Sequence, residues 1–501
     1  MTSAGAAAAS PPSRGARRPG LAVGRLLRLE LRRSTMLWML PLLAVLLAVT
    51  ELRNDLSHPP LWVVRSTVVQ YQLELIGAVV AGVAAWTAGR DGRRRLTDLV
   101  TATAWPRWAR QLAAWAAVTA WAMLLYAASV AVVFLATARQ ATWGGPIWWL
   151  PGVGAAAIVA FSAAGFAFGA LLPGRFAAPL VAVAAVLAPQ VGVLALQRHL
   201  SWGRLSPVED PTVPGTGIFF PFHAGLPIVQ IMFLAGLTAA AMGVLALPAA
   251  AGGRRLRQAG AMIALAGLAA ACTGLALAGT ARQEAQGVII PALHNAAADK
   301  LITYTPACDN SSPIPVCLHP AYRAMLPAMA VSLDPVLGQV AGLPGAPVRV
   351  QLGAVIPHDF NGNIGVTISG SPPVLYLSPS ILLRLGTCPA ADCFTATDFT
   401  KAMGPLVAGT IVHNLIDGGR RGNAAQQAIG AALAKVAGLP LLAWAAPGRP
   451  GQVGNGVPAR GSPAYAAAQR FAALPAAVRH EWLASHLAPL RAGRITLAEI
   501  P

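Results

Sequence analysis

The sequence has few charged residues. Only 11% of its 501 residues are charged, whereas soluble proteins average about 25%. The hydrophobic share is 55% and the mean hydropathy is +0.58. This composition excludes an ordinary soluble chain and predicts a membrane protein in contact with the lipid bilayer.

Lysine is nearly missing, which bears on nucleotide hydrolysis. The only lysines are Lys300, Lys401 and Lys435, and they follow Asp, Thr and Ala. A P-loop needs a lysine directly after a glycine, because that side chain must reach phosphates held by the glycine-rich backbone. The chain therefore has no P-loop ATPase of its own.

Acidic residues are also scarce, which leaves a formal charge of +19. The basic residues do not form a patch with interleaved aromatics, so we predict no nucleic-acid partner. They are instead distributed as the positive-inside rule expects for a chain with seven spans and a cytoplasmic amino terminus. Seventeen arginines then lie in inner segments and five in outer loops. The predicted spans are 36–52, 73–88, 112–136, 147–172, 176–196, 228–250 and 261–280.

Cysteine is limited to five residues, and four of them form two close pairs in the polar half of the chain. These pairs are Cys308 with Cys317 and Cys388 with Cys393, while Cys272 lies in an apolar segment. Such pairs are typical of local disulfides in an oxidising compartment. The spacings C-x8-C and C-x4-C fit common zinc sites poorly. Free thiols remain the alternative.

The fold class predicted is a multi-pass α-helical membrane protein of about seven transmembrane helices, followed by an extracytoplasmic α+β domain. Residues 1–19 form a disordered cytoplasmic tail, 20–35 a basic amphipathic interfacial helix, and 36–280 a permease-like membrane domain. In the domain 281–501, residues 347–355 and 363–370 alternate like strands. Helices are predicted from His319, over 398–416, over 423–439 and in a final hairpin after 447–463.

An arginine-rich loop, residues 89–112, separates the second and third spans. Six arginines stand there against two aspartates, which places the loop in the cytoplasm. A short helix is predicted within it, with Leu96, Leu99 and Val100 on one face. Such a helix is suited to contacting another protein, although the arginines alone would also hold the loop against anionic lipid.

Two histidine motifs resemble the zinc-binding sequence H-E-x-x-H. HEWLASH, His480 to His486, places its second histidine six residues after the first, on the far side of a helix. HNLID keeps the five-residue frame of H-E-x-x-H, but Asn414 replaces the general base. His413 and Asp417 are therefore only weak metal candidates. We predict no catalytic residues, no enzyme activity and no cofactor.

The basic interfacial helix, the membrane core and the loop GRDGRRRLTDLVTATAWPRWARQL together resemble the membrane subunit of a type-2 ABC transporter. The resemblance covers roughly the first half of the chain. It implies a coupling loop that packs on a separate ATP-binding cassette ATPase, an amino-terminal helix along the membrane, and re-entry of residues 215–227 from outside. The coupling residues implied are Arg93, Arg94, Arg95, Leu96, Asp98, Leu99 and Val100.

The expected function is ATP-driven transport at the plasma membrane, by a non-catalytic subunit that acts as a homodimer or heterodimer. The large outer domain departs from this family pattern. Some members of the family are fused to domains that resemble gluzincin aminopeptidases. A tethered, degenerate metallopeptidase-like protein and a membrane-anchored sensor or scaffold are therefore the alternatives. For residues 199–227, an interfacial loop anchored by Phe219, Phe220 and Phe222 is the alternative to re-entry.

Overall fold

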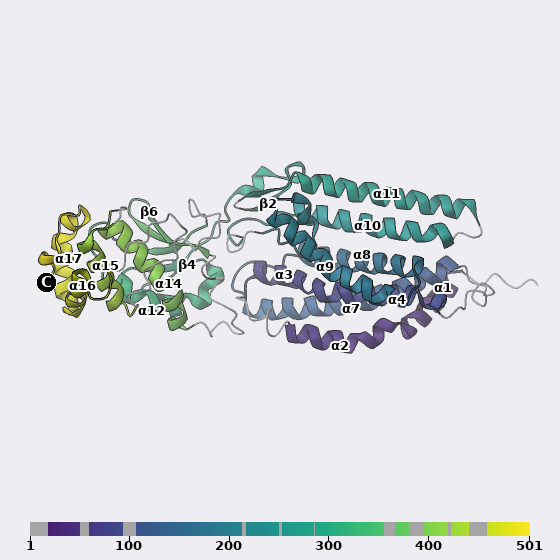
Figure 1. Ribbon diagram of the computed structural model, residues 1–501, viewed down its shortest axis with the longest axis horizontal. Helices are drawn as coiled ribbons and strands as arrows, with labels where there is room; N and C mark the ends of the chain where they lie inside the picture. The colour runs from purple at the N-terminus through teal and green to yellow at the C-terminus, as the bar shows by residue number, and fades with distance from the viewer. Residues whose placement is uncertain are drawn as a thin grey trace, which may run out of the picture.

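The computed structural model is elongated, with a bundle of long helices at one end and a half that contains a sheet at the other (Figure 1). The helical bundle holds the amino-terminal part of the chain, and the carboxyl terminus lies at the far end of the sheet-containing half. The structure describes residues 19–50, 60–93, 107–212, 217–249, 253–284, 286–354, 366–379, 382, 395–418, 422–439 and 458–501.

Six helical segments among the described residues are long and apolar enough to cross a membrane. The first joins α3 to α4 and the sixth is α11, which ends where the sheet-containing half begins. Their bounds are α3 Trp62–Tyr71 with α4 Leu73–Ala88, α7 Arg107–Gln140, α8 Trp149–Leu171, α9 Ala177–Gln197, α10 Gly225–Ala249 and α11 Arg254–Gly279.

The first predicted span does not reach this length alone. Helix α2, Thr35–Thr50, has 16 residues, or about 24 Å, against a hydrocarbon core of about 30 Å. It is long enough to cross a membrane only when it is combined with the end of α1, Pro19–Arg33. The two helices are bent by 52° relative to each other. The basic amphipathic helix predicted over 20–35 is thus α1, set at an angle to α2.

The second predicted span starts earlier than the sequence indicates. The apolar pattern of the sequence predicts that this span begins at Leu73, but α3 begins at Trp62. Polar residues hid this extension, because Arg65, Gln70 and Gln72 interrupt the apolar run. All three are buried, and the Ser129 hydroxyl donates to Gln72 Oε1 at 2.5 Å. Arg65 therefore lies inside the bundle and not in an outer loop.

Helices α10 and α11 pack through small residues. The buried positions of α11 are Gly260, Ala264, Gly267, Ala271, Gly274 and Ala278, which recur every three or four residues. A Cβ atom at Gly267 would lie 2.5 Å from the Ala240 nitrogen and 2.6 Å from the Gly236 oxygen. The two backbones therefore approach as closely as small-residue stripes allow in membrane helices.

Helices α9 and α11 expose large apolar side chains. Leu180 and Leu187 on α9 and Leu265 and Leu268 on α11 are each at least half exposed. A broad apolar surface of this kind is unusual on a soluble monomer and is typical of a membrane or protein contact. Burial of these faces in lipid is the simplest way to remove them from water.

The sheet-containing half has a mixed five-stranded sheet in the order β3-β4-β5-β7-β6. Strand β4 runs parallel to β5 and β5 parallel to β7, while the edge pairs are antiparallel. A short β1–β2 hairpin precedes it. The strands are β1 Arg282–Glu284, β2 Gly287–Ile289, β3 Ala307–Asp309, β4 Val316–Leu318, β5 Val350–Leu352, β6 Val366–Ser369 and β7 Val374–Leu377.

Helices pack around this sheet over one apolar core that includes Leu318, Leu333, Phe399 and Phe471. The helix predicted from His319 appears as the 3-10 helix η5, Pro320–Met325, followed by α12, and the final predicted hairpin appears as α16 and α17. The predicted α+β mixture is confirmed for the described residues, but strands β3, β4 and β7 of the sheet and the β1–β2 hairpin were not predicted. The helices are α12 Leu326–Leu337, α14 Ala396–Ile411, α15 Ala424–Val436, α16 Pro463–Ala473 and α17 Ala476–Arg491.

Aromatic packing joins the two halves. His319, at the start of η5, is fully buried among Trp143, Phe219 and Tyr304. Phe219 and Phe220 belong to the core of the sheet-containing half. The aromatic end of the 199–227 segment therefore packs against that half. These two rings are therefore not exposed as an interfacial loop would have them, while Val208, earlier in the same segment, packs in the core of the helical bundle.

Candidate functional site: the arginine-rich end of the bundle

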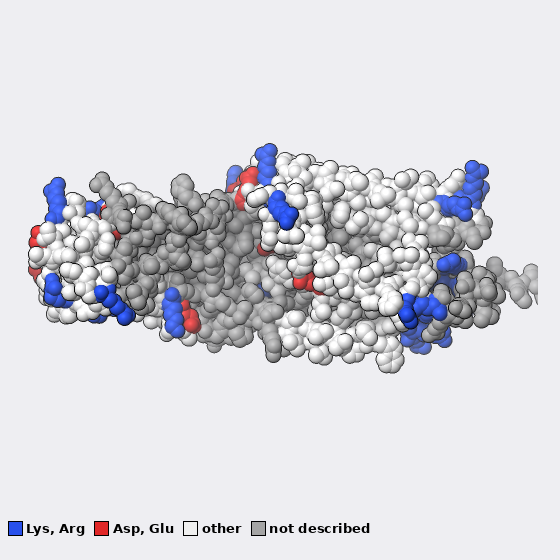
Figure 2. All heavy atoms as spheres, in the orientation of Figure 1, with Lys and Arg blue, Asp and Glu red and all other residues white. Residues whose placement is uncertain are grey.

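Arginine side chains gather at the end of the bundle that is distant from the sheet. Figure 2 shows this blue cluster near α1 and the beginning of α11, whereas the surface along the middle of the helices is almost free of charge. The apolar belt between charged ends matches the layering of a bilayer. The arginines described there are Arg25, Arg28, Arg32, Arg33, Arg90, Arg93, Arg107, Arg110, Arg175, Arg254, Arg255 and Arg257.

The structure describes the base of the predicted coupling loop. Helix α4 ends at Ala88, and the short helix α5, Arg90–Arg93, follows Gly89. The chain is described again from Arg107, where α7 begins. Of the predicted coupling residues only Arg93 is described. Arg94, Arg95, Leu96, Asp98, Leu99 and Val100 lie outside the described residues.

Arg93 folds back along α4. Its Nη2 donates to the Trp86 carbonyl at 2.6 Å, and its guanidinium carbon lies 3.8 Å from the centre of the Trp86 ring. A Cβ atom at Gly89 would lie 2.5 Å from Arg93 Nη1. Glycine at this position therefore leaves room for the guanidinium. Hydrogen bonding and cation–π attraction together hold the short helix α5 against the end of α4.

Helix α1 is connected to the same base. Arg90 Nη2 lies 3.6 Å from Glu30 Oε1, and the Trp121 indole donates to the Leu31 carbonyl at 3.0 Å. A half-exposed ion pair of this kind contributes little stability. Its consequence is positional, because it sets the basic amphipathic helix directly beside the start of the loop.

A polar hollow of about 500 Å³ lies between these elements. Its volume is within the range of ligand pockets. Its lining comes from α1, α2, α4 and α5 and consists of Glu30, Arg33, Thr35, Trp86, Thr87, Arg90 and Arg93.

One disulfide is present in the described residues. Cys308 and Cys317 pair across β3 and β4, with the sequence-local connection that was predicted. Cys388 and Cys393 lie outside the described residues. Cys272 is a free thiol on α11. The bond between β3 and β4 is typical of a protein half that matures in an oxidising compartment.

The HNLID segment forms a single π-helical turn, Val412–Ile416. Asp417 follows it and is 3% exposed, and its Oδ1 atom has no hydrogen-bond partner. Burial raises the pKa of this carboxyl to about 7. Within the described residues, His413 and Asp417 are not part of a metal-ligand group of three.

The two histidines of HEWLASH on α17 have separate contacts. His480 Nε2 lies 2.8 Å from the Ala341 carbonyl oxygen. His486 stacks on Trp482 with 4.6 Å between the ring centres. The two side chains therefore contact different parts of the protein.

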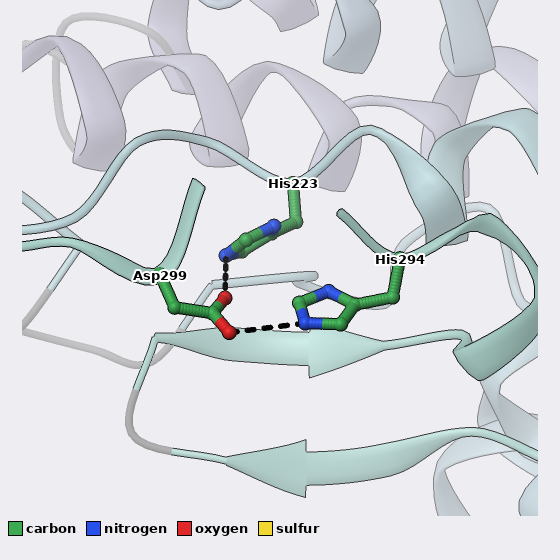
Figure 3. Close-up of side chains that lie close together, drawn as sticks. All are labelled: His223, His294 and Asp299. Carbon is green, nitrogen blue, oxygen red and sulfur yellow. Dashed lines mark hydrogen bonds and ion pairs between the residues drawn. The ribbon is translucent and has the colours of Figure 1, made fainter. Parts of the chain in front are cut away.

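A group that the sequence did not indicate lies near the junction of the two halves. Figure 3 shows His223 and His294 directed at the two oxygens of Asp299. Burial lowers the pKa of the His223 imidazole, and the Asp299 carboxylate opposes that effect. The residues come from separate segments without a metal-binding motif, so only the fold brings them together.

The comparisons with known proteins find no matching family model, no matching curated protein and no matching solved structure.

Proposed function

We propose that this chain is the membrane-spanning subunit of an ATP-driven ABC-type transporter, which couples to a separate ATPase through residues 89–112. The observation that carries the proposal is the arrangement at the base of that loop. There α5, the end of α4 and the basic helix α1 are held together by Arg90–Glu30 and by Arg93 on Trp86. A rigid base allows force from a docked partner to pass into α4 and α7.

The proposed orientation places the arginine-rich end in the cytoplasm. The positive-inside rule favours this side for loops with excess arginine. The sheet-containing half then lies outside the cytoplasm, where the Cys308–Cys317 disulfide is stable. The charge distribution and the disulfide are independent observations, and they favour the same topology.

The proposed energy source is a separate protein, because none of the three lysines follows a glycine. In this proposal the docking helix is carried by residues 96–105, and the polar hollow beside Arg90 receives a side chain of the ATPase. The sheet-containing half would contact the transported substrate or a partner at the outer surface.

The proposal is tested by changing the loop and measuring association with the ATPase. The coupling variant combines Leu99→Asp with Arg94→Glu. Its matched control combines Leu301→Asp with Arg282→Glu, two exposed residues in the sheet-containing half. Both proteins are tagged, purified in mild detergent and analysed for a co-purifying ATP-binding subunit.

We expect the coupling variant to lose the ATPase while the control retains it at the wild-type ratio. The buried docking face then carries an uncompensated carboxylate, which is costly at an interface. Equal retention by both variants would refute the assignment of the coupling loop. Co-purification of a signalling protein in place of an ATPase would favour a sensor.

A further inference from the structure

We infer that His223, His294 and Asp299 form a binding site for a divalent transition-metal ion of the zinc class. This inference is independent of the proposed transport function. It rests on the positions of three side chains at the junction between the helical bundle and the sheet-containing half (Figure 3).

The three ligands come from two stretches of chain that pack on each other. His223 lies just before α10, whereas His294 follows the 3-10 turn Pro291–Leu293 and Asp299 ends the turn Ala296–Asp299. Apolar contacts hold the stretches in place, since Leu226 and Val229 share a small core with Val288 and Ile290. The ligand positions are therefore set by buried packing and not by one mobile loop.

Local hydrogen bonds also fix the segment that carries the second and third ligands. The Asn295 side chain accepts a hydrogen bond from the Ala297 nitrogen at 3.1 Å and caps the turn that ends at Asp299. A Cβ atom at Gly225 would stand 3.6 Å from Ile290 and 3.7 Å from Leu293. The side chains of Ile290 and Leu293 thus lie close to the backbone at Gly225.

The distances between ligand atoms suit a zinc ion. Asp299 Oδ2 lies 3.1 Å from His294 Nε2, and Asp299 Oδ1 lies 3.7 Å from His223 Nε2. One ligand atom from each residue lies within 4.8 Å of the other two. Tetrahedral zinc with bonds of about 2.0–2.2 Å separates its ligand atoms by about 3.3 Å. Small side-chain rotations are enough to bring the three atoms around one centre.

Unmatched polar atoms point to a missing partner. His223 Nε2 and Asp299 Oδ1 are both buried, and neither has a hydrogen-bond partner. They face each other at 3.7 Å, which is too long for a hydrogen bond. Leaving two buried polar atoms without a hydrogen bond is unfavourable. A cation between them would satisfy both atoms and also the second oxygen of the carboxylate.

The ligand types select the class of ion. Imidazole favours zinc, copper, iron and nickel, whereas calcium and magnesium prefer sites made of oxygen ligands. Two imidazoles and one carboxylate are the set found in open zinc sites, with water in the fourth position. His223, His294 and Asp299 side chains are 10%, 20% and 33% exposed. That partial exposure leaves a route for the ion and for the water.

Binding would join two elements that otherwise meet through apolar contacts. The ion would fasten the segment before α10 to the segment that follows the β1–β2 hairpin. The expected consequence is a stiffer connection between the last helical hairpin and the sheet-containing half, since a metal held across segments contributes its binding energy to that arrangement.

The test measures zinc binding to the full chain in detergent micelles, after removal of metal with a chelator. Cys388 and Cys393 are changed to serine in every protein, so that their thiols contribute no zinc. Zinc alone is added by equilibrium dialysis, and the bound metal is measured by mass spectrometry. The ligand variants are His294→Ala and Asp299→Asn. The matched control is His199→Ala, an exposed histidine near the carboxyl end of α9.

We expect one zinc ion per parent chain, at least tenfold weaker binding in each ligand variant, and unchanged binding in the control. Cobalt added to the parent chain gives a second reading that does not depend on folding of the variants. It should produce the visible absorption of a tetrahedral nitrogen and oxygen site without a thiolate band. Equal zinc binding by the parent and both ligand variants, or no visible cobalt absorption, would overturn the inference.

Discussion

Replacing Asp417 with asparagine should stabilise the protein in a manner that depends on pH. Asp417 follows the π-helical turn, and its carboxyl is buried with one oxygen that has no hydrogen-bond partner. Burial raises its pKa from 3.8 to about 7. Asparagine has nearly the same shape but carries no charge, so it removes the cost of burying the ionised form.

The direction of the effect follows from proton linkage. In the unfolded chain the carboxyl ionises near its ordinary pKa, whereas in the folded protein it keeps its proton up to about pH 7. Folding therefore becomes less favourable as the pH rises between these two values. The full cost above pH 7 is about 4 kcal/mol, and about 3 kcal/mol of it develops between pH 5 and pH 8. The Asp417→Asn variant lacks this loss.

The assay is thermal unfolding of the full chain in detergent at several pH values from 5 to 8. The melting temperature of the variant should exceed that of the wild type by several degrees at pH 8, and the difference should shrink toward pH 5. Glu481→Gln on the exposed surface of α17 is the control, with no change in the pH profile expected. Parallel pH profiles for wild type and Asp417→Asn would refute the reasoning.

Two further predictions concern the helical bundle. Gly267→Leu should destabilise the protein by about 1–3 kcal/mol in thermal unfolding, because the new side chain meets the α10 backbone. The control is Gly279→Leu on the same helix, where the new side chain has open space. Equal melting temperatures for the two variants would contradict close packing of α10 and α11. Arg93→Lys should weaken ATPase association about two- to fivefold in a binding titration, because it loses the stacking on Trp86. The control Arg25→Lys should bind normally, and an equal loss there would point to general charge effects.

Long apolar runs made most of the helical half predictable. Helices α8 and α9 lie close to their predicted positions, because few polar residues interrupt them. The start of α3 was missed since Arg65 and Gln70 look like loop residues in sequence, and only burial between helices explains them. A short stretch of sequence shows that such residues are polar, but it does not show the neighbouring helices that bury them.

The sheet-containing half was less predictable for two physical reasons. Strands β3 and β4 have three residues each, so they are too short to show an alternating pattern of apolar and polar residues. The close pair of Cys308 and Cys317 predicted the disulfide between them but not the strands. The segment with Phe219 and Phe220 looked like a membrane contact because aromatic rings favour both lipid and protein cores. Tertiary packing against His319 and Tyr304 decided between them.

The two candidate sites also differ in how much of each the sequence predicts. The arginine excess around Arg90 and Arg93 is local and was visible in the sequence, whereas the contact with Glu30 on α1 was not. The group of His223, His294 and Asp299 has no local spacing at all. Its only sequence sign is a histidine beside an aromatic segment, which is too common to indicate a site.

The central claim is that this chain works with a separate ATPase, and the most direct test is purification of the unaltered, tagged protein in mild detergent. The identity and ratio of co-purifying proteins are measured by mass spectrometry. We expect an ATP-binding subunit to co-purify in a fixed ratio to the chain. Its absence under conditions that preserve a known transporter complex of this type would contradict the account.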